Sequence, residues 1–299
     1  MSTSAELEEI VQALEQSGKY RVLRQIEPRS RFHTNDKKLP ERRGIILDVE
    51  TTGLDNSIDE IIEIALLPFT YGLNGKLYGV HEPYHSLQDT SREILPEITA
   101  ITSITKEMLE GKEIDIEALE SLVSRADLII AHNAAFDRPF AEKLSKEFKV
   151  KPWACSMSQI NWRQEGFEGN KLPYLVSQAG YFYDGHRAVN DCVATLELLA
   201  MNLPNSRTSA FATLLETARE NTTRIWAVGA PYDRKDDLKS RGYRWNAEAS
   251  SNKPKAWFVD VPEVDTQREL EFLYNKIFGQ QLSLPSNKIT AVDRFSNRV

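Results

Sequence analysis

Residues 44–50 form the sequence Gly-Ile-Ile-Leu-Asp-Val-Glu, a nearly all-apolar segment that ends with two acids. A short segment of this kind predicts a strand buried in the middle of a sheet. Side chains alternate between the two faces of a strand, so Asp48 and Glu50 point the same way. Two neighbouring carboxylates repel each other unless a cation lies between them, and Mg²⁺ and Mn²⁺ prefer oxygen ligands. The alternative for this motif alone is a solvent-facing pair of acids at a strand end.

Around this strand the chain carries further strand and helix patterns. Strand-like segments flank the Asn74-Gly75 dipeptide, which predicts a hairpin and an initial three-stranded meander. Further patterns follow, strands at 127–131 and 153–157 and helices at 135–148, 171–179 and 188–203. Three strands followed by alternating strands and helices predict an α/β fold, with a mixed sheet flanked by helices.

Two further acids lie in the helical segments. Asp137 is just inside the helix that follows strand 127–131, where the helix dipole alone would favour an acid. Asp191 lies in the helix 188–203 beside apolar residues such as Val189. A carboxylate near an apolar helix face is costly without a partner, so Asp191 is the stronger candidate for a metal ligand.

Two histidines compete for the role of a base. His186 precedes the helix 188–203 by two residues and could titrate near neutral pH, although a lone histidine there could also be an ordinary surface residue. His132 follows the strand 127–131. We expect His132 to be structural and to orient the turn from strand to helix, because Asp137 supplies the ligand of that motif.

Three segments resemble the motifs of one enzyme family. Residues 46–54 are similar to the first exonuclease motif of the DnaQ-like superfamily, 132–137 to the second and 186–191 to the third. The third motif matches the histidine variant, because Arg187 occupies the position that is tyrosine in the other variant. The chain therefore resembles the DEDDh 3′→5′ exonucleases, which include the proofreading ε subunit of bacterial DNA polymerase III.

The resemblance implies a ribonuclease H-like fold and removal of nucleoside 5′-monophosphates from DNA 3′ ends, in proofreading or repair. It also implies two divalent cations, Mg²⁺ or Mn²⁺, held by Asp48, Glu50, Asp137 and Asp191. Two such cations, about 4 Å apart, stabilise the attacking and the leaving oxygens of a phosphodiester. His186 would accept the proton of the attacking water as general base, and Glu50 would help to position that water.

The same match assigns substrate contacts. The backbone at Thr51 and Thr52 would lie near the terminal 3′-hydroxyl, and Leu54 would wedge against the last base. Asn133 and Phe136 would border the terminal nucleotides. For Leu54 and Phe136 the alternative is simple core packing.

One segment departs from the family. Residues 101–105 have the sequence Ile-Thr-Ser-Ile-Thr where the family often has Gly-Ile-Thr, so Ser103 replaces the glycine. This segment usually borders the substrate groove. The binding details there stay open, while the metal chemistry is unaffected.

The chain is expected to contain more than the exonuclease domain. The expected divisions are an N-terminal helix and basic linker (1–41), the DnaQ-like domain (42–204), a connector (205–222), a small tryptophan-rich α+β module (223–284) and a polar tail (285–299). We expect this tail to fray.

The module intersperses basic residues with five aromatic ones, Trp226, Tyr232, Tyr243, Trp245 and Trp257. Aromatic side chains beside basic ones suit stacking on single-stranded bases. The alternative is that a small module needs tryptophans to build a core. Residues 280–284, Gln-Gln-Leu-Ser-Leu, resemble the short peptides that bind bacterial sliding clamps.

Composition limits the setting in which the protein works. The net charge of −7 argues against a general DNA coat but not against an enzyme that uses carboxylates. Residues 19–43 contain nine Lys or Arg and only three acids. The basic side chains of this segment could bind the phosphates of a nucleic acid. Two cysteines without a CxxC pattern, a polar N-terminus and the lack of a long apolar run predict a cytoplasmic protein with no membrane partner.

Three hypotheses about function stay open. The first is the DNA exonuclease, and the second is an RNA-trimming 3′→5′ exoribonuclease on the same scaffold, since no motif reads the 2′-hydroxyl. The third is a non-catalytic protein that binds single-stranded nucleic acid, against which the four carboxylates and His186 argue. The residues after 204 are too few for a polymerase domain, so proofreading would need a separate polymerase subunit, with a sliding clamp as a further candidate partner.

Overall fold

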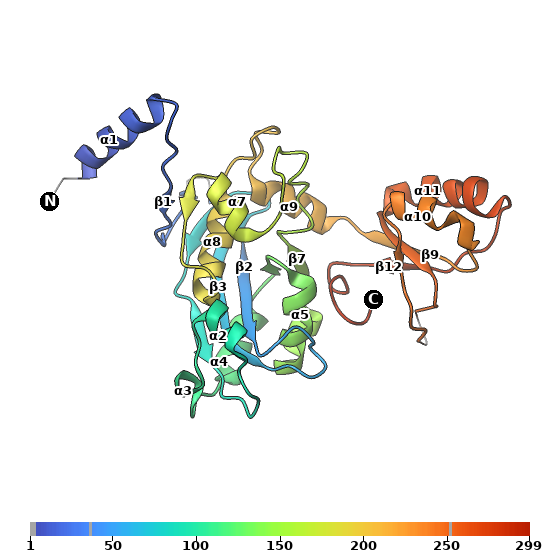
Figure 1. Ribbon diagram of the computed structural model, residues 1–299, viewed down its shortest axis with the longest axis horizontal. Coiled ribbons are helices and arrows are strands. Elements are labelled where there is room, and N and C mark those ends of the chain that lie inside the picture. The colour runs from blue at the N-terminus through green and yellow to red at the C-terminus, as the bar shows by residue number, and fades with distance from the viewer. Residues whose placement is uncertain (1–3, 36–37, 251–252) are drawn as a thin grey trace.

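The chain folds into a main domain and a smaller C-terminal module, each with its own sheet and hydrophobic core (Figure 1). The computed structural model describes residues 4–35, 38–250 and 253–299. Within this part of the chain, no helix is both long enough and apolar enough to cross a membrane.

The main sheet is built around β2, which contains the apolar segment 44–50. Its strands are β2 (Glu41–Thr51), β3 (Ile61–Gly72), β4 (Leu77–Val80), β5 (Tyr84–Leu87), β6 (Leu128–Ala131) and β7 (Trp153–Cys155). The strand order is β4-β3-β2-β6-β7, and β5 also pairs with β3. Because β2 is antiparallel to β3 and parallel to β6, the sheet is mixed, as predicted. The predicted hairpin joins β3 to β4, with Gly75 at φ 79° in the turn.

Helices cover both faces of this sheet. They are α2 (Pro96–Thr102), α3 (Lys106–Leu109), α4 (Ile116–Ser124), α5 (Ala134–Leu144), α6 (Glu147–Val150), α7 (Leu172–Gln178), α8 (Ala188–Ala200) and α9 (Ala210–Arg219). Ile46 packs in the cluster formed with α7, α8 and α9, whereas Ile45 and Leu47 pack in the cluster formed with α4 and α5. Asp48 and Glu50 occupy the positions of β2 that alternate with Ile45 and Leu47, so they point to the opposite face, which α8 covers.

The N-terminal segment is attached to the main domain through a short strand pair. Helix α1 (Ser4–Gln16) projects away from the body of the molecule (Figure 1). Strand β1 (Arg24–Gln25) pairs in parallel with β8 (Tyr181–Phe182), which leads toward α8. An ion pair of 2.8 Å between Arg24 and Glu8 links α1 to this strand.

The C-terminal module is a four-stranded antiparallel sheet with helices on one face. It contains β9 (Thr222–Ala227), η1 (Tyr232–Arg234), α10 (Lys235–Ser240), β10 (Arg244–Trp245), β11 (Trp257–Pro262), η2 (Glu263–Asp265), α11 (Thr266–Phe272), η3 (Leu273–Phe278) and β12 (Ser286–Ile289). The strand order is β10-β11-β9-β12. Ile225, Leu238 and Leu273 lie in its core, so this unit is α+β, as predicted.

The aromatic residues of the module have two different environments. Trp226 and Tyr243 are buried, and Trp257 packs against the core. Tyr232 and Trp245 are exposed. Packing therefore explains the first three, Trp226 against Phe258 on the opposite face of the sheet and the other two at the core, while Tyr232 and Trp245 are the most exposed of the five.

The polar tail is ordered, and the prediction that it frays is wrong. Residues 286–289 form β12 at the edge of the module sheet, and the chain then returns to the main domain. Two carbonyls, those of Val292 and Arg294, accept hydrogen bonds from the fully buried guanidinium of Arg138 on α5. Backbone carbonyls carry no signal in the sequence, so a polar composition did not indicate this docking.

Candidate active site

Three carboxylates converge at the end of strand β2. Asp48 and Glu50 point to the same face, and Asp191 approaches from α8, which packs on that face. One oxygen from each of the three lies within 4.8 Å of the others. The strand alternation that predicted the first pair is confirmed by this convergence.

Asp191 is held from two sides at the start of α8. The hydroxyl of Tyr183 donates to Oδ1 at 2.9 Å, and the backbone N–H of Arg187 donates to Oδ2 at 3.1 Å. These two contacts orient the carboxylate toward β2. Sequence patterns did not indicate Tyr183, because it lies in an irregular segment eight residues before Asp191.

Asp137 approaches the cluster from the other face of the sheet. It is buried in the first turn of α5, and its Oδ1 accepts a hydrogen bond of 3.3 Å from the backbone N–H of Val49. Its oxygens are not among those that converge within 4.8 Å. Its charge nevertheless acts on Asp48, so it stands beside the cluster.

Burial raises the pKa of all four acids, and neighbouring carboxylates add to the shift of Asp48, Glu50 and Asp137. Burial, with the charges of Asp191 and Glu63, raises the pKa of Glu50 to about 8. Burial raises the pKa of Asp137 to about 7, although the N–H of Val49 opposes the shift. The pKa of Asp48 lies well above its ordinary value, first through burial and then through the charge of Asp137.

This donor set fits a hard divalent cation. All the donor atoms are carboxylate oxygens, which suit Mg²⁺ or Mn²⁺ better than softer metals. A cation among them would favour their charged forms and so oppose the burial and repulsion that raise their pKa values. The cluster is therefore suited to divalent metal binding.

The predicted base, His186, lies at the entrance to α8. It is exposed and has a left-handed backbone with φ 62°. Burial raises the pKa of Asp191, and the neighbouring His186 opposes this shift. The next residue, Arg187, is anchored by Glu63 on β3, with Nη2 to Oε1 at 2.8 Å. The backbone N–H of Ala188 also donates to Glu63 at 2.9 Å, so the first turn of α8 is fixed next to His186.

Glu63 is a second residue that the sequence analysis missed. It pairs with Glu50 across β2 and β3, and its side chain is almost fully buried. Burial alone would raise its pKa, but hydrogen bonds from His85, Arg187 and Ala188 lower it to about 2. A charged residue inside the apolar segment 61–67 was the available signal, since such a residue needs partners.

His132 is enclosed and does not face the carboxylates. Its Nδ1 lies 2.9 Å from the hydroxyl of Ser156, and its Nε2 lies 2.8 Å from the carbonyl oxygen of Asn170. Burial lowers its pKa to about 4, so the ring is neutral at neutral pH. These contacts agree with the structural role expected for His132, and they link the second motif to the loop after β7.

The residues expected to contact substrate lie at the edges of the cluster. Thr51 and Thr52 are buried, and their hydroxyls donate to the carbonyl oxygen of Gly53 and to the carboxylate of Asp59. Only their backbone atoms are therefore left for the predicted contact with substrate. Leu54 is 84 % exposed, which excludes core packing for it.

The other two predicted contact residues come from the second motif. Asn133 is exposed at the turn before α5. Phe136 is half-buried, and its ring lies 5.1 Å from that of Phe140, so it belongs partly to the core. Ser103, which replaces the family's glycine, ends α2 with φ 58°, a conformation that suits glycine best.

A family model described as an exonuclease matches residues 45–199 of the chain, which include all three motifs. The PolC-type DNA polymerase III of Thermotoga maritima is 35% identical over 188 residues, which are 58% of this chain and 13% of that protein. The 3′-5′ exonuclease DinG of Staphylococcus haemolyticus is 39% identical over 163 residues, 52% of this chain and 17% of that protein. The chain thus spans a small part of the curated relatives that it matches.

Solved structures agree on the fold. Escherichia coli Exonuclease I, solved in complex with a dT13 oligonucleotide, superimposes with a TM-score of 0.52 at 14% identity, over 74% of this chain and 63% of that one. A second Exonuclease I structure gives a TM-score of 0.50 at 15% identity, over 84% of this chain and 63% of that one. The ribonuclease H-like fold that the motifs predicted is confirmed.

Proposed function

Since the chain belongs to the exonuclease family, we propose that it removes nucleoside 5′-monophosphates from the 3′ ends of DNA. The observation that carries this proposal is the convergence of Asp48, Glu50 and Asp191 within 4.8 Å, next to the exposed His186. The names of the relatives, a DNA polymerase III and a 3′-5′ exonuclease, support DNA and this polarity.

The four acids would hold two divalent cations, Mg²⁺ or Mn²⁺. When bound, such cations lower the pKa of an attacking water and offset the charge that develops on the phosphate. In our proposal the chain's own residues divide the remaining work. Glu50 orients the water, His186 accepts its proton, and Tyr183 and Arg187 keep Asp191 in position.

The substrate's 3′ end would enter beside the turn after β2. The backbone at Thr51 and Thr52 would meet the terminal 3′-hydroxyl, and the exposed Leu54 would pack against the last base. Asn133 and Phe136 would border the nucleotides that follow. Of these residues, Leu54 and Asn133 are exposed, Phe136 is half-buried, and Thr51 and Thr52 are buried.

A polymerase subunit or a sliding clamp is a further candidate partner. In the segment 280–284, Gln280 and Gln281 are exposed, while Leu284 packs against the module core. A clamp-binding role therefore requires Leu284 to leave that core. Pull-down of a purified clamp by wild type and by Gln281→Ala tests this partner, and equal capture would remove it. We place the protein in the cytoplasm, as expected for an enzyme related to a DNA polymerase III and a DinG exonuclease.

A metal-titrated digest tests the proposed activity. Single-stranded DNA, duplex DNA and RNA of matched sequence, labelled at the 5′ end, are incubated with wild type and with Asp191→Ala. We expect stepwise shortening of DNA that depends on Mg²⁺ or Mn²⁺, and a loss of at least about 100-fold in the variant. Faster shortening of RNA would favour the exoribonuclease instead. A folded wild type that binds strands but never shortens them would leave only the binding protein.

A further inference from the structure

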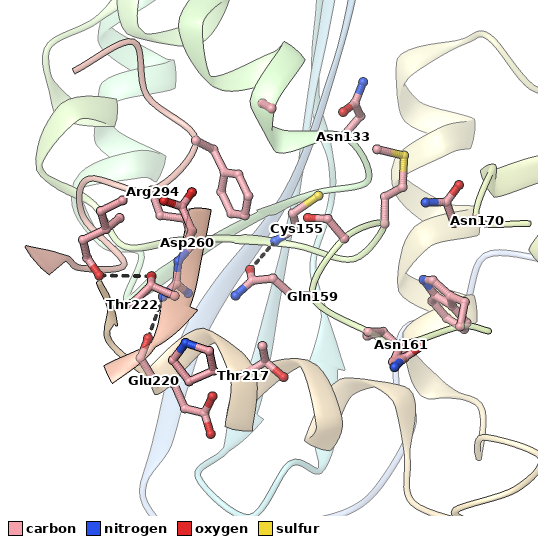
Figure 2. A pocket seen from close by; sticks show the side chains of 18 of the residues that line it. Asn133, Cys155, Gln159, Asn161, Asn170, Thr217, Glu220, Thr222, Asp260 and Arg294 are labelled. Atoms are coloured by element: carbon pink, nitrogen blue, oxygen red, sulfur yellow. Dashed lines mark hydrogen bonds between the residues drawn. The ribbon is translucent and has the colours of Figure 1, made fainter. Parts of the chain in front are cut away.

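A large groove lies between the main domain and the C-terminal module. It has a cavity volume of about 1260 Å³, above the ~300–1,000 Å³ usual for small-ligand pockets. One wall is the loop 157–170 after β7, and the other is formed by β9, β11 and the tail. Residues of α9 line it between these walls (Figure 2). This size suits a polymer better than a single small molecule.

The groove reaches the second motif, beside the proposed active site. Asn133 and Ala135 line it, and they belong to the turn and first residues of α5, which lead to Asp137. A strand whose 3′ end lies at the carboxylates must continue away from them in the 5′ direction. From the second motif, the groove leads such a strand toward the module.

The module wall presents one aromatic ring, Phe258, with two guanidinium groups beside it. Side chains alternate along β11, so Phe258 and Asp260 face the groove while Val259 enters the core. The guanidinium carbons of Arg224 and Arg244 lie 4.6 Å and 4.8 Å from the centre of the Phe258 ring. Unpaired bases stack on aromatic rings and on guanidinium planes of this kind.

Asp260 organises this surface. Its carboxylate accepts from Arg224 at 2.6 Å and from Arg244 at 3.2 Å, which holds both guanidiniums beside Phe258. Arg224 is nearly buried, whereas the side chain of Arg244 is 65% exposed. Arg244 is therefore the cation of this set that a ligand can reach.

The opposite wall carries polar groups. Figure 2 shows Asn161 and Asn170 on the side facing Asp260 and Arg294. Arg163 on this wall is exposed and forms no ion pair within the described residues. Amides and one or two accessible cations suit the edges and phosphates of a few nucleotides, so stacking rather than charge would supply most of the binding.

We propose that this groove binds the single-stranded part of the substrate on the 5′ side of the cleaved bond, with bases stacked on Phe258 and Arg244. The proposal rests on the proposed function, because the active site fixes the direction of the strand. It assigns the module a role in holding substrate. The exposed Tyr232 and Trp245 that composition suggested for stacking do not line the groove.

Strand length separates this subsite from the active site. A trinucleotide cannot reach the module, whereas a strand of about 15 nucleotides spans typical single-strand sites. The measured quantity is the ratio of kcat/KM for the long strand to that for the trinucleotide. In Phe258→Ala we expect this ratio to fall at least about 5-fold, since stacking on one aromatic ring contributes ~1–3 kcal/mol per base.

Two further variants complete the design. Arg244→Glu changes an exposed side chain without opening the core, and it should lower the ratio in the same direction. Tyr232→Ala removes an aromatic ring that is 80% exposed on the same module but outside the groove, and it should keep the wild-type ratio. A wild-type ratio in both groove variants would overturn the proposal, as would an equal loss with both substrates.

Binding without turnover separates this inference from the activity itself. Fluorescence anisotropy of a dye-labelled strand, DNA or RNA, is measured in the presence of EDTA. Weaker binding by Arg244→Glu than by Tyr232→Ala supports the groove even if wild type hydrolyses nothing, in which case only the proposed activity fails. Equal binding by the two variants, with normal hydrolysis by wild type, overturns the groove alone.

Discussion

Asp191 illustrates how single side chains set the geometry of the carboxylate cluster. Its two oxygens each accept one hydrogen bond, from the Tyr183 hydroxyl and from the Arg187 N–H. Burial and the adjacent Asp191 raise the pKa of Tyr183 far above its ordinary value, so the phenol stays a donor across the working pH range. Tyr183 is therefore a positioning residue for a metal ligand.

Removing the Tyr183 hydroxyl should weaken metal binding more than folding. In Tyr183→Phe we expect apparent Mg²⁺ affinity to fall about 10- to 100-fold, as for other residues that orient metal ligands. Initial rates of strand shortening across a Mg²⁺ titration measure this shift, with Tyr181→Phe as the control in the same segment. An unchanged titration midpoint would contradict the positioning role.

Glu63 links stability to pH. Its pKa of about 2 lies below the ordinary value of 4.5, so its ionised form stabilises the fold above pH 4.5. That contribution is lost as the pH falls from 4.5 toward 2. We expect Glu63→Gln to be less stable than wild type at neutral pH, and the difference to shrink over this interval.

Urea unfolding at a series of pH values checks the Glu63 prediction. Glu113→Gln, a surface acid whose side chain is exposed, serves as the matched control. A stability difference that stays constant between neutral pH and pH 2 would show that the ionised carboxylate is not what anchors Arg187 and Ala188.

At this scale, the sequence predicts residues whose placement follows from local periodicity. Asp48 and Glu50 share a face because a strand alternates, and Asp191 lies on an apolar helix face. Glu63 and Tyr183 depend on which strand pairs with β2 and on the path of an irregular segment. The apolar neighbours of Glu63 indicate locally only that it needs partners, and no local pattern indicates Tyr183 or identifies the partners of either residue.

At the level of elements, the return of the chain tail to α5 is the least expected feature. Arg138 is buried next to Asp137, and two of its hydrogen bonds go to carbonyls of Val292 and Arg294. Arg294 in turn donates to the carbonyls of Ala218 and Glu220. The tail thus supports the helix that carries a predicted metal ligand.

Deleting residues 291–299 should destabilise the main domain. The deletion leaves the charged donors of Arg138 without two acceptors, which costs about 1–3 kcal/mol or more for a buried group. Arg138→Met removes that unmet donor. The same deletion should therefore lower the free energy of unfolding by less in the Arg138→Met variant than in wild type. Urea unfolding of the four chains measures this coupling, and strictly additive costs would show that Arg138 does not depend on the tail.

The boundaries of strands and helices were predictable where patterns were strong. The central strands and α5, α7 and α8 lie close to their predicted residues. The edge strand β12 is polar, because an edge strand of a small sheet needs few apolar side chains, and composition alone therefore indicated a loose tail.

At the level of the whole molecule, the cluster of acids sets stability against function. Four buried carboxylates without a cation destabilise the fold. A cation that binds only the folded state stabilises it by mass action, by about 2.7 kcal/mol when the free cation concentration is 100 times its Kd. We expect Mn²⁺ to raise the Tm of wild type. Asp48→Asn should raise the Tm in EDTA, because it removes an acid whose charged form burial disfavours, and should lose most of the Mn²⁺ effect.

Thermal unfolding followed by circular dichroism checks this pair of effects. Asp55→Asn, an acid in the turn after β2 that bonds to Ser57, is the control for charge removal. An equal rise of the Tm with Mn²⁺ in wild type and Asp48→Asn would contradict metal binding at this cluster.

The groove between the main domain and the module could not be predicted from the sequence. Its two walls lie far apart in the sequence, so only the tertiary structure brings them together.

The docking of the tail also has a consequence for the order of events during synthesis. Arg138 meets its last acceptor at Arg294, 156 residues further along the chain. At about 5–20 residues per second, a ribosome needs roughly 8 to 30 s to make that stretch. Throughout that interval the guanidinium of Arg138 on the nascent α5 lacks its two carbonyl acceptors. We therefore expect exonuclease activity to appear only after the chain tail has left the ribosome.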